Sequence, residues 1–254
     1  MATNTKVNAI ILCGGEGTRV KDISGGVPKC VMEVGGKPFL FHLLHQLYRS
    51  GVVDRVILAA GDKGAQINEI MAKGAGVPGP RIEGFMGMDV FWAEEWGPRG
   101  TLFGMLSALP YVNSDYILIM NGDTLCLWFD FRKFLIHSLN SKQTLVIAEY
   151  KGHSSGVWYV DTIFLHEVWD IYREFFLSGQ KVDREFLLHK LSSIKPVWGT
   201  FINPLTRPTS TGSRLIETVT VDVGYFQMDM PFIDIGTVSG YEKAINEIKW
   251  EEFI

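Results

Sequence analysis

The chain alternates between short apolar runs and segments with helical spacing. Three apolar runs each end at turn-forming residues, which is typical of strands buried on both faces: residues 7–13, 55–60 and 116–120. Residues 38–50 instead carry apolar side chains at helical spacing, with Pro38 suited to the first turn and Gly51 to the C-terminal cap. The same reasoning predicts helices over residues 64–73, 101–109 and 131–139.

Strands that alternate with helices predict an α/β fold. We expect a Rossmann-like, mainly parallel sheet with helices on both faces and ligands at the carboxyl ends of the strands. After residue 150 the pattern is less regular, with a strand predicted over 156–160 and helices over 162–177 and 184–191. Residues 200–213 are rich in Thr, Pro, Gly and Ser, which predicts a lid or an assembly loop.

Composition limits the classes of function. The 254 residues carry 24 basic and 28 acidic side chains, a net charge of −4, so we expect neither nucleic acid nor membrane as a partner. Cys13, Cys30 and Cys126 have neither a metal-ligand spacing nor a disulfide pattern, which favours a reducing cytoplasm. The first apolar run is too short to span a membrane and lacks a cleavage pattern. We therefore expect a soluble, unprocessed, cytoplasmic protein.

A glycine-rich segment follows the first apolar run. This glycine loop, residues 12–19, reads Leu12-Cys13-Gly14-Gly15-Glu16-Gly17-Thr18-Arg19. Closely spaced glycines after a strand let the backbone bring several N–H groups against a phosphate. The spacing fits neither the Walker loop nor the dinucleotide fingerprint, and an ordinary strand-to-helix turn is the alternative. Arg19 and the later Lys29 favour phosphate, because both add cations near the loop.

Asp123 is the first candidate ligand of a cation. It follows the apolar run 116–120 within Asn121-Gly122-Asp123, at the predicted binding edge of the sheet. Magnesium could join its carboxylate to phosphate oxygens there. The alternative is a plain turn, since Asn-Gly-Asp is common turn chemistry.

Asp234 is the second candidate. Its neighbours Ile233 and Ile235 are apolar, and burying a carboxylate among them is costly unless it is paired or bound to a cation. Magnesium shared with Asp123 would meet that requirement. A structural role remains the alternative, because Ser239 and Glu242 have the spacing of a capping box that opens a final helix.

Four segments together resemble the signature of the sugar-1-phosphate nucleotidyltransferases, the pyrophosphorylases that make nucleotide sugars. They are the glycine loop, the segments around Asp123 and Asp234, and Glu95-Trp96-Gly97-Pro98-Arg99-Gly100-Thr101. Further stretches resemble most the D-glycero-D-manno-heptose-1-phosphate guanylyltransferase branch: Val27-Pro28-Lys29, Gly35-Gly36-Lys37-Pro38-Phe39-Leu40 and Gly61-Asp62-Lys63-Gly64. The resemblance implies a GT-A-like nucleotidyltransferase fold in one domain over residues 1–254. Residues 1–150 would bind the nucleotide, and residues 151–254 the acceptor and a second metal ligand.

The resemblance also implies a reaction and roles for residues. A nucleoside triphosphate would give its nucleotidyl group to a sugar 1-phosphate in the presence of Mg²⁺, releasing pyrophosphate and an NDP-sugar, with GDP-heptose for cell-surface polysaccharide as a candidate. Arg19, Lys29 and Asp123 would be catalytic, and Asp123 with Asp234 would hold the metal. Asn121 and Gly156 would line the acceptor. The implied nucleotide-binding residues are Leu12, Cys13, Gly14, Gly15, Gly17, Thr18, Arg19, Glu95, Gly100 and Thr101.

Glu95 bears on the choice of base. It falls five residues before Gly100, where the family places a base-reading side chain. An ionised glutamate only accepts hydrogen bonds, which suits the N1–H and exocyclic amine of guanine and opposes the carbonyl oxygens of uracil or thymine. GTP is therefore the favoured nucleotide. The alternative interpretation of Glu95 is an ordinary surface glutamate on a loop.

The chain also departs from the family. The family's Glu-Lys pair, which grips the acceptor, has no room in residues 149–156, whereas residues 201–227 are longer than expected. We expect Arg207 and Arg214 to supply the missing acceptor contact.

Two alternative functions stay open: an enzyme that uses CTP or UTP with another phosphorylated acceptor, and a catalytically silent regulatory relative. A related glycosyltransferase would carry Asp-x-Asp at a strand end, which residues 121–123 lack. Homo-oligomers are compatible with the sequence.

Overall fold

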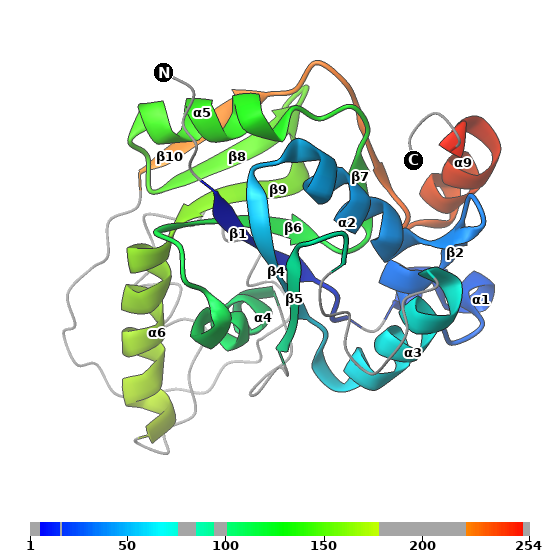
Figure 1. Cartoon of the computed structure of the whole chain (residues 1–254), viewed down its shortest axis with the longest axis horizontal. Coiled ribbons are helices and arrows are strands. Elements are labelled where there is room, and N and C mark those ends of the chain that lie inside the picture. The colour runs from blue at the N-terminus through cyan, green and yellow to red at the C-terminus, as the bar shows by residue number, and fades with distance from the viewer. Residues whose placement is uncertain (1–5, 16, 76–84, 94–100, 178–221, 251–254) are drawn as a thin grey trace, which may run out of the picture.

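A single large sheet organises the molecule. The structure, a computed structural model, describes residues 6–15, 17–75, 85–93, 101–177 and 222–250. Within these residues, seven strands form one sheet in the order β10-β8-β9-β6-β1-β4-β5 (Figure 1). Their bounds are β1 (Val7–Leu12), β4 (Val53–Ala59), β5 (Asp89–Ala93), β6 (Tyr116–Asn121), β8 (Leu145–Tyr150), β9 (His153–Asp161) and β10 (Val223–Gln227).

The sheet is mainly parallel, as predicted. Strand β1 pairs in parallel with β4 and β6, β4 with β5, and β10 with β8. Strand β9 runs antiparallel between β6 and β8. The carboxyl ends of β1, β4, β5 and β6 therefore meet at one edge, where the predicted ligand-binding residues follow them.

Helices cover both faces of the sheet, which confirms that prediction. Buried side chains place α2 (Phe39–Ser50), α3 (Gly64–Ala75) and α5 (Phe131–Ser141) against one face. The other face is covered by α4 (Thr101–Ala108) and α6 (Thr162–Leu177). Among the described helices, none has both the length and the apolar character needed to cross a bilayer.

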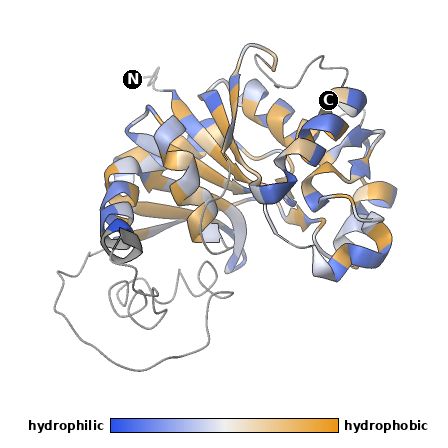
Figure 2. Cartoon of the chain, turned by 90° about the horizontal axis from the view of Figure 1, so that it is seen from below, coloured by the Kyte–Doolittle hydropathy of each residue, from blue (hydrophilic) through white to orange (hydrophobic). Residues whose placement is uncertain are grey.

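Strand β1 shows why the apolar runs form buried strands. Val7, Ala9 and Ile11 pack into the core on the α2 side, whereas Ile10 packs into the core on the α4 side. Successive side chains of a strand point to opposite faces, so a strand covered by helices on both sides has to be apolar throughout. Figure 2 shows the result, with hydrophobic residues gathered along the strands and hydrophilic ones on the outer sides of helices.

Smaller elements complete the described chain, and several lie beside the carboxyl edge. They are η1 (Thr18–Val20), α1 (Lys21–Ser24), η2 (Lys29–Val31), β2 (Glu33–Val34), β3 (Lys37–Pro38), η3 (Gly61–Lys63), η4 (Leu109–Tyr111), β7 (Thr124–Cys126), β11 (Phe232–Asp234) and α9 (Val238–Glu247). The final helix begins earlier than the Ser239 capping box predicts, because the Thr237 hydroxyl accepts the Gly240 N–H as its N-cap. The predicted helix over 184–191 and the segment 200–213 lie outside the described residues.

Candidate functional site

The glycine loop begins where β1 ends at the carboxyl edge. The N–H groups of Cys13 and Gly14 both donate to the Ala59 carbonyl at the end of β4, over 2.8 and 3.0 Å. Gly15 and Gly17 then take φ values of +110° and +67°, which side chains rarely tolerate. A Cβ on Gly17 would also stand 3.2 Å from Cγ of Lys29. These two glycines are therefore needed for the shape of the loop and for its contact with Lys29.

Gly122 brings Asp123 against the same loop. Strands β1 and β6 are in register, with Leu12 opposite Asn121, and the Gly122 N–H donates to the Leu12 carbonyl over 3.0 Å. A Cβ on Gly122 would lie 2.7 Å from that carbonyl oxygen. The glycine of Asn121-Gly122-Asp123 is thus required by close backbone approach, beyond any turn preference. The alternative interpretation as a plain turn misses this contact.

Asp234 reaches Asp123 through a short antiparallel pair. Strand β11 pairs with β7, with Asp234 opposite Thr124. The Ile235 N–H continues the pairing by donating to the Asp123 carbonyl over 2.9 Å. Two aspartates far apart in the sequence therefore lie beside each other at the carboxyl edge, as the sequence predicts for a shared cation.

Gly236 leaves the space in which three charged groups converge. A Cβ at this position would lie 2.6 Å from Oδ2 of Asp123, 2.8 Å from Oδ1 of Asp234 and 3.1 Å from Nζ of Lys29. The Gly236 N–H donates to Oδ1 of Asp234 over 2.7 Å and so orients that carboxylate. Any side chain at residue 236 would displace at least one of the three groups. We call Lys29, Asp123, Asp234 and Gly236 the carboxylate cluster.

Charges of opposite sign are paired within this cluster. Nζ of Lys29 lies 2.5 Å from Oδ2 of Asp123, and both side chains are more than four-fifths buried. Arg19 is more exposed, and its guanidinium reaches Oδ2 of Asp234 at 3.9 Å. Burial raises the pKa of Asp234, and the nearby negative charge of Asp123 raises it further. The Gly236 N–H and the positive charges of Arg19 and Lys29 lower this pKa by less. Burial, the largest cause, and the second carboxylate together outweigh the three groups that lower this pKa.

The donor set fits a hard divalent cation. Among the described residues, no group of three or more His, Cys, Asp or Glu side chains could hold a metal ion on its own. Two carboxylates alone do not complete the coordination of a metal ion. They do match Mg²⁺, which is commonly bound through one or two carboxylates together with substrate phosphates and water. The raised pKa of Asp234 points the same way, because an added cation would relieve the repulsion between the carboxylates.

Asn121 and Gly156 form the adjoining part of the edge. Gly156 has a φ of +74°, and a Cβ there would lie 2.6 Å from Nδ2 of Asn121. The structure thus brings these two predicted acceptor residues together. Glu95, Gly100, Arg207 and Arg214 lie outside the described residues, whereas Thr101 begins α4 and Thr18 begins η1.

Two residues beside the site were not among the predicted site residues. Gly236 belongs to a motif that the sequence singled out, but its role depends on contacts with distant residues. Lys63 donates from Nζ to the Gly15 carbonyl over 2.6 Å and so contacts the glycine loop directly. The Gly61-Asp62-Lys63-Gly64 stretch was the signal that could have identified it.

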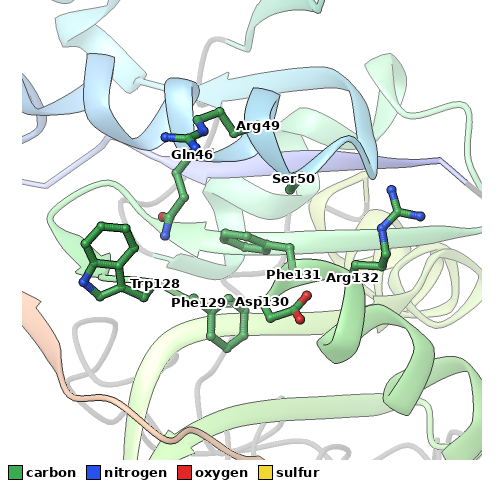
Figure 3. Close-up of a pocket in the computed structure, with 8 residues that line it drawn as sticks. All are labelled: Gln46, Arg49, Ser50, Trp128, Phe129, Asp130, Phe131 and Arg132. Atoms are coloured by element: carbon green, nitrogen blue, oxygen red, sulfur yellow. The ribbon is translucent and has the colours of Figure 1, made fainter. Parts of the chain in front are cut away.

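A separate cavity lies between the C-terminal end of α2 and the start of α5. It has a volume of about 410 Å³ (Figure 3). Gln46 extends into it from α2 and donates to the Cys126 carbonyl, and the Trp128 side chain borders it. Its lining residues are Gln46, Arg49, Ser50, Trp128, Phe129, Asp130, Phe131 and Arg132, which include no predicted site residue.

Solved structures define the class of fold. HddC from Yersinia pseudotuberculosis matches with a TM-score of 0.61 at 22% identity, over 94% of this chain and 97% of that one. The inositol-1-phosphate CTP transferase from T. maritima matches with a TM-score of 0.60 at 14% identity, over 98% and 95%. The chain therefore has the Rossmann-like fold of the nucleotidyltransferases.

The sequence places the chain within a family. The model of the MobA-like NTP transferase domain matches residues 9–207, and the chain belongs to this family. A D-glycero-alpha-D-manno-heptose 1-phosphate guanylyltransferase from Aneurinibacillus thermoaerophilus is 31% identical over 56% of this chain and 56% of its own length. The enzyme of that name from Campylobacter jejuni is 33% identical over 46% and 48%. A mannose-1-phosphate guanylyltransferase from Mycobacterium tuberculosis is 30% identical over 49% and 32%. The chain thus matches between a third and a little over half of the length of these relatives.

Proposed function

We propose that this protein transfers a nucleotidyl group from a nucleoside triphosphate, with GTP favoured, to a sugar 1-phosphate. The products are pyrophosphate and an NDP-sugar, with GDP-heptose as the candidate. One observation carries the proposal: Lys29, Asp123 and Asp234 meet around Gly236, beside a glycine loop in which Gly15 and Gly17 both have positive φ. This combination places cations and two carboxylates suited to a metal ion at the edge where α/β sheets bind ligands.

In the proposed reaction a phosphate oxygen of the acceptor attacks the α-phosphorus, and the bond to pyrophosphate breaks. No covalent intermediate with the protein is needed, so positioning and charge neutralisation supply the catalysis. Lys29 contacts the phosphates at the reacting centre, and Arg19 steadies the leaving pyrophosphate. Asp123 and Asp234 would hold Mg²⁺, which when bound supplies positive charge to the phosphate oxygens.

Two kinds of observation support GTP. The relatives named above as guanylyltransferases act, by their names, with guanine nucleotides, and one solved HddC structure is described as complexed with GMP-PN. Independently, Glu95 can only accept hydrogen bonds from a base. Glu95→Gln should therefore raise the KM for GTP far more than the KM for UTP. Equal effects on the two nucleotides would contradict the role of Glu95.

The acceptor side rests on Asn121 and Gly156, with Arg207 and Arg214 as the proposed contacts to the acceptor phosphate. Arg207→Ala and Arg214→Ala should raise the acceptor KM and leave the nucleotide KM unchanged. An unchanged acceptor KM in both variants would remove these arginines from the site.

The central experiment measures pyrophosphate release. The protein is incubated with Mg²⁺, each common nucleoside triphosphate and a panel of sugar 1-phosphates, beside the matched variant Asp123→Asn. We expect release with GTP and a heptose or mannose 1-phosphate, and its loss in the variant. Release only with CTP would instead favour the cytidylyl reaction. A Bacillus subtilis relative named "Probable glucose-1-phosphate cytidylyltransferase" is 41% identical over 25% of this chain and 24% of its own length. No release with any pair would favour a silent regulatory protein.

A further inference from the structure

Lys63 ties the glycine loop to a neighbouring strand end. Its Nζ donates to the Gly15 carbonyl over 2.6 Å. Lys63 is the last residue of η3, which follows β4 at the carboxyl edge. The contact joins two segments that are distant in the sequence. Lys63 belongs neither to the predicted site residues nor to the carboxylate cluster.

The backbone beneath Lys63 is well anchored. The Lys63 N–H donates to the Ala60 carbonyl, and the Ala60 N–H donates to the Ala93 carbonyl at the end of β5, both over 3.3 Å. The adjacent Ala59 carbonyl accepts the first two N–H groups of the loop, from Cys13 and Gly14. The connection after β4 therefore holds the loop at two points: the Ala59 carbonyl binds its first N–H groups, and the Lys63 side chain binds the Gly15 carbonyl.

Gly15 is the position at which such a restraint matters. Its φ of +110° is a conformation that residues with a side chain rarely adopt, and among the described residues other than its chain neighbours no heavy atom lies within 4 Å of the place where a Cβ would stand. Side-chain packing therefore does not hold the backbone there, and glycine is the residue with the most conformational freedom to lose. The ammonium of Lys63 supplies the restraint through a charge-assisted hydrogen bond.

The same contact changes the electrostatics of the loop. A free carbonyl oxygen beside a triphosphate would add partial negative charge to a site that has to bind an anion. With the Lys63 ammonium on that oxygen, the Gly15 carbonyl is turned toward a cation, and a third positive charge joins those of Arg19 and Lys29 near the loop.

We propose that Lys63 is a positioning residue for the triphosphate of the nucleotide: it holds the glycine loop in its binding shape through the Gly15 carbonyl. The inference rests on the proposed function, since it assigns the loop to a triphosphate. Lys63 acts on nucleotide binding and leaves the acceptor and the chemical step alone. Its loss therefore affects the nucleotide KM, with little change in kcat at saturating nucleotide.

Calorimetric titration tests this without turnover. Inorganic tripolyphosphate and GTP, each with Mg²⁺, are titrated into the wild type, Lys63→Met and Lys63→Arg. The matched control is Lys73→Met, which changes an exposed lysine in the last turn of α3 that pairs with Glu69. We expect Lys63→Met to weaken both ligands by about tenfold, since a hydrogen bond to a charged group is lost. Lys63→Arg should retain affinity within about threefold because it keeps the charge and the donor. Lys73→Met and all thermal midpoints should stay unchanged.

Each contrary outcome has a distinct meaning. If the wild type binds tripolyphosphate or GTP and Lys63→Met binds it equally tightly, the role of Lys63 is wrong and the proposed function stands. A lower kcat with an unchanged nucleotide KM would likewise overturn it. If the wild type binds no triphosphate, the proposed function fails, and the inference about Lys63 fails with it.

Discussion

Gly236→Ala tests the carboxylate cluster with a single methyl group. The glycine is not in the left-handed region, so alanine can adopt its backbone conformation and the change adds only volume. The added Cβ would lie 2.6 Å from Oδ2 of Asp123 and 2.8 Å from Oδ1 of Asp234, whereas real Cβ contacts are essentially never under 3.0 Å. The Asp123 oxygen, the nearer of the two, must therefore withdraw from its place beside Lys29 by about 0.4 Å to clear 3.0 Å, and by about 0.8 Å to reach ordinary contact at 3.4 Å.

The expected loss follows from how sharply catalysis depends on position. Displacements of about 1 Å can cost on the order of 100-fold in rate, and binding constellations have to be held within about 0.5 Å. We expect kcat/KM for pyrophosphate release to fall by about 100-fold, equivalent to about 2.7 kcal/mol of transition-state stabilisation. We expect the thermal midpoint to fall as well, because Gly236 is buried beside the core residue Ile235 and the displaced Lys29–Asp123 pair is largely buried, so folding is checked at the assay temperature.

The assay uses the substrate pair that supports pyrophosphate release in the wild type, with circular dichroism to confirm folding. Gly64→Ala is the matched control, because a Cβ there would meet its nearest neighbours at 3.7 and 3.8 Å, which is ordinary contact. If Gly236→Ala kept more than about a third of the wild-type kcat/KM, less than 1 kcal/mol would be lost, and the argument that the three charged groups must close around this glycine would be refuted.

Three further predictions concern stability. Burial lowers the pKa of His42 from an ordinary 6.5 to about 4, so the unfolded chain takes up the proton first as pH falls. Between pH 7 and pH 4 the free energy of unfolding should therefore drop by about 3 kcal/mol more in the wild type than in His42→Gln, as measured by urea titration. Parallel pH profiles would contradict this. Gly122→Ala should destabilise the fold by about 2 to 3 kcal/mol, because its Cβ would lie 2.7 Å from the Leu12 carbonyl oxygen, and an unchanged denaturation midpoint would show that the backbones can separate freely. Asp130→Ala should cost about 1 kcal/mol, since the Asp130 carboxylate caps α5 by accepting the Lys133 N–H, and Asp130→Asn should recover most of that loss if capping is the cause.

Long periodic segments were predictable because their signal is local. The helix predicted over residues 38–50 forms as α2, and the apolar run 116–120 forms β6 with one more residue. Strand β5 escaped prediction because Asp89–Ala93 is short and has only partial burial along its length. The strand predicted over 156–160 proved to be the end of the longer β9, whose first residues are exposed and polar and so lack the apolar pattern.

The candidate site divides along the same line between local and long-range signals. Arg19, Lys29, Asp123 and Asp234 could be predicted because charged residues beside strand-end turns are visible in the sequence. The structural need for Gly122 and Gly236 could not be predicted, because it arises from backbone and carboxylate atoms that only the folded sheet brings within 3 Å. Lys63 likewise gains its partner only through the parallel pairing of β1 with β4.

Charge balance is a further reason to propose that a metal ion binds at this site together with the triphosphate. Without ligands, Lys29 and Arg19 face Asp123 and Asp234, so the charges of these four groups sum to zero. A triphosphate brings several negative charges to that neutral cluster, in which burial and the charge of Asp123 already raise the pKa of Asp234. A divalent cation arriving with the nucleotide would offset part of this charge, and Lys63 would add one more positive charge at the loop. Triphosphate binding should therefore weaken strongly when Mg²⁺ is removed, and it should weaken further in Lys63→Met.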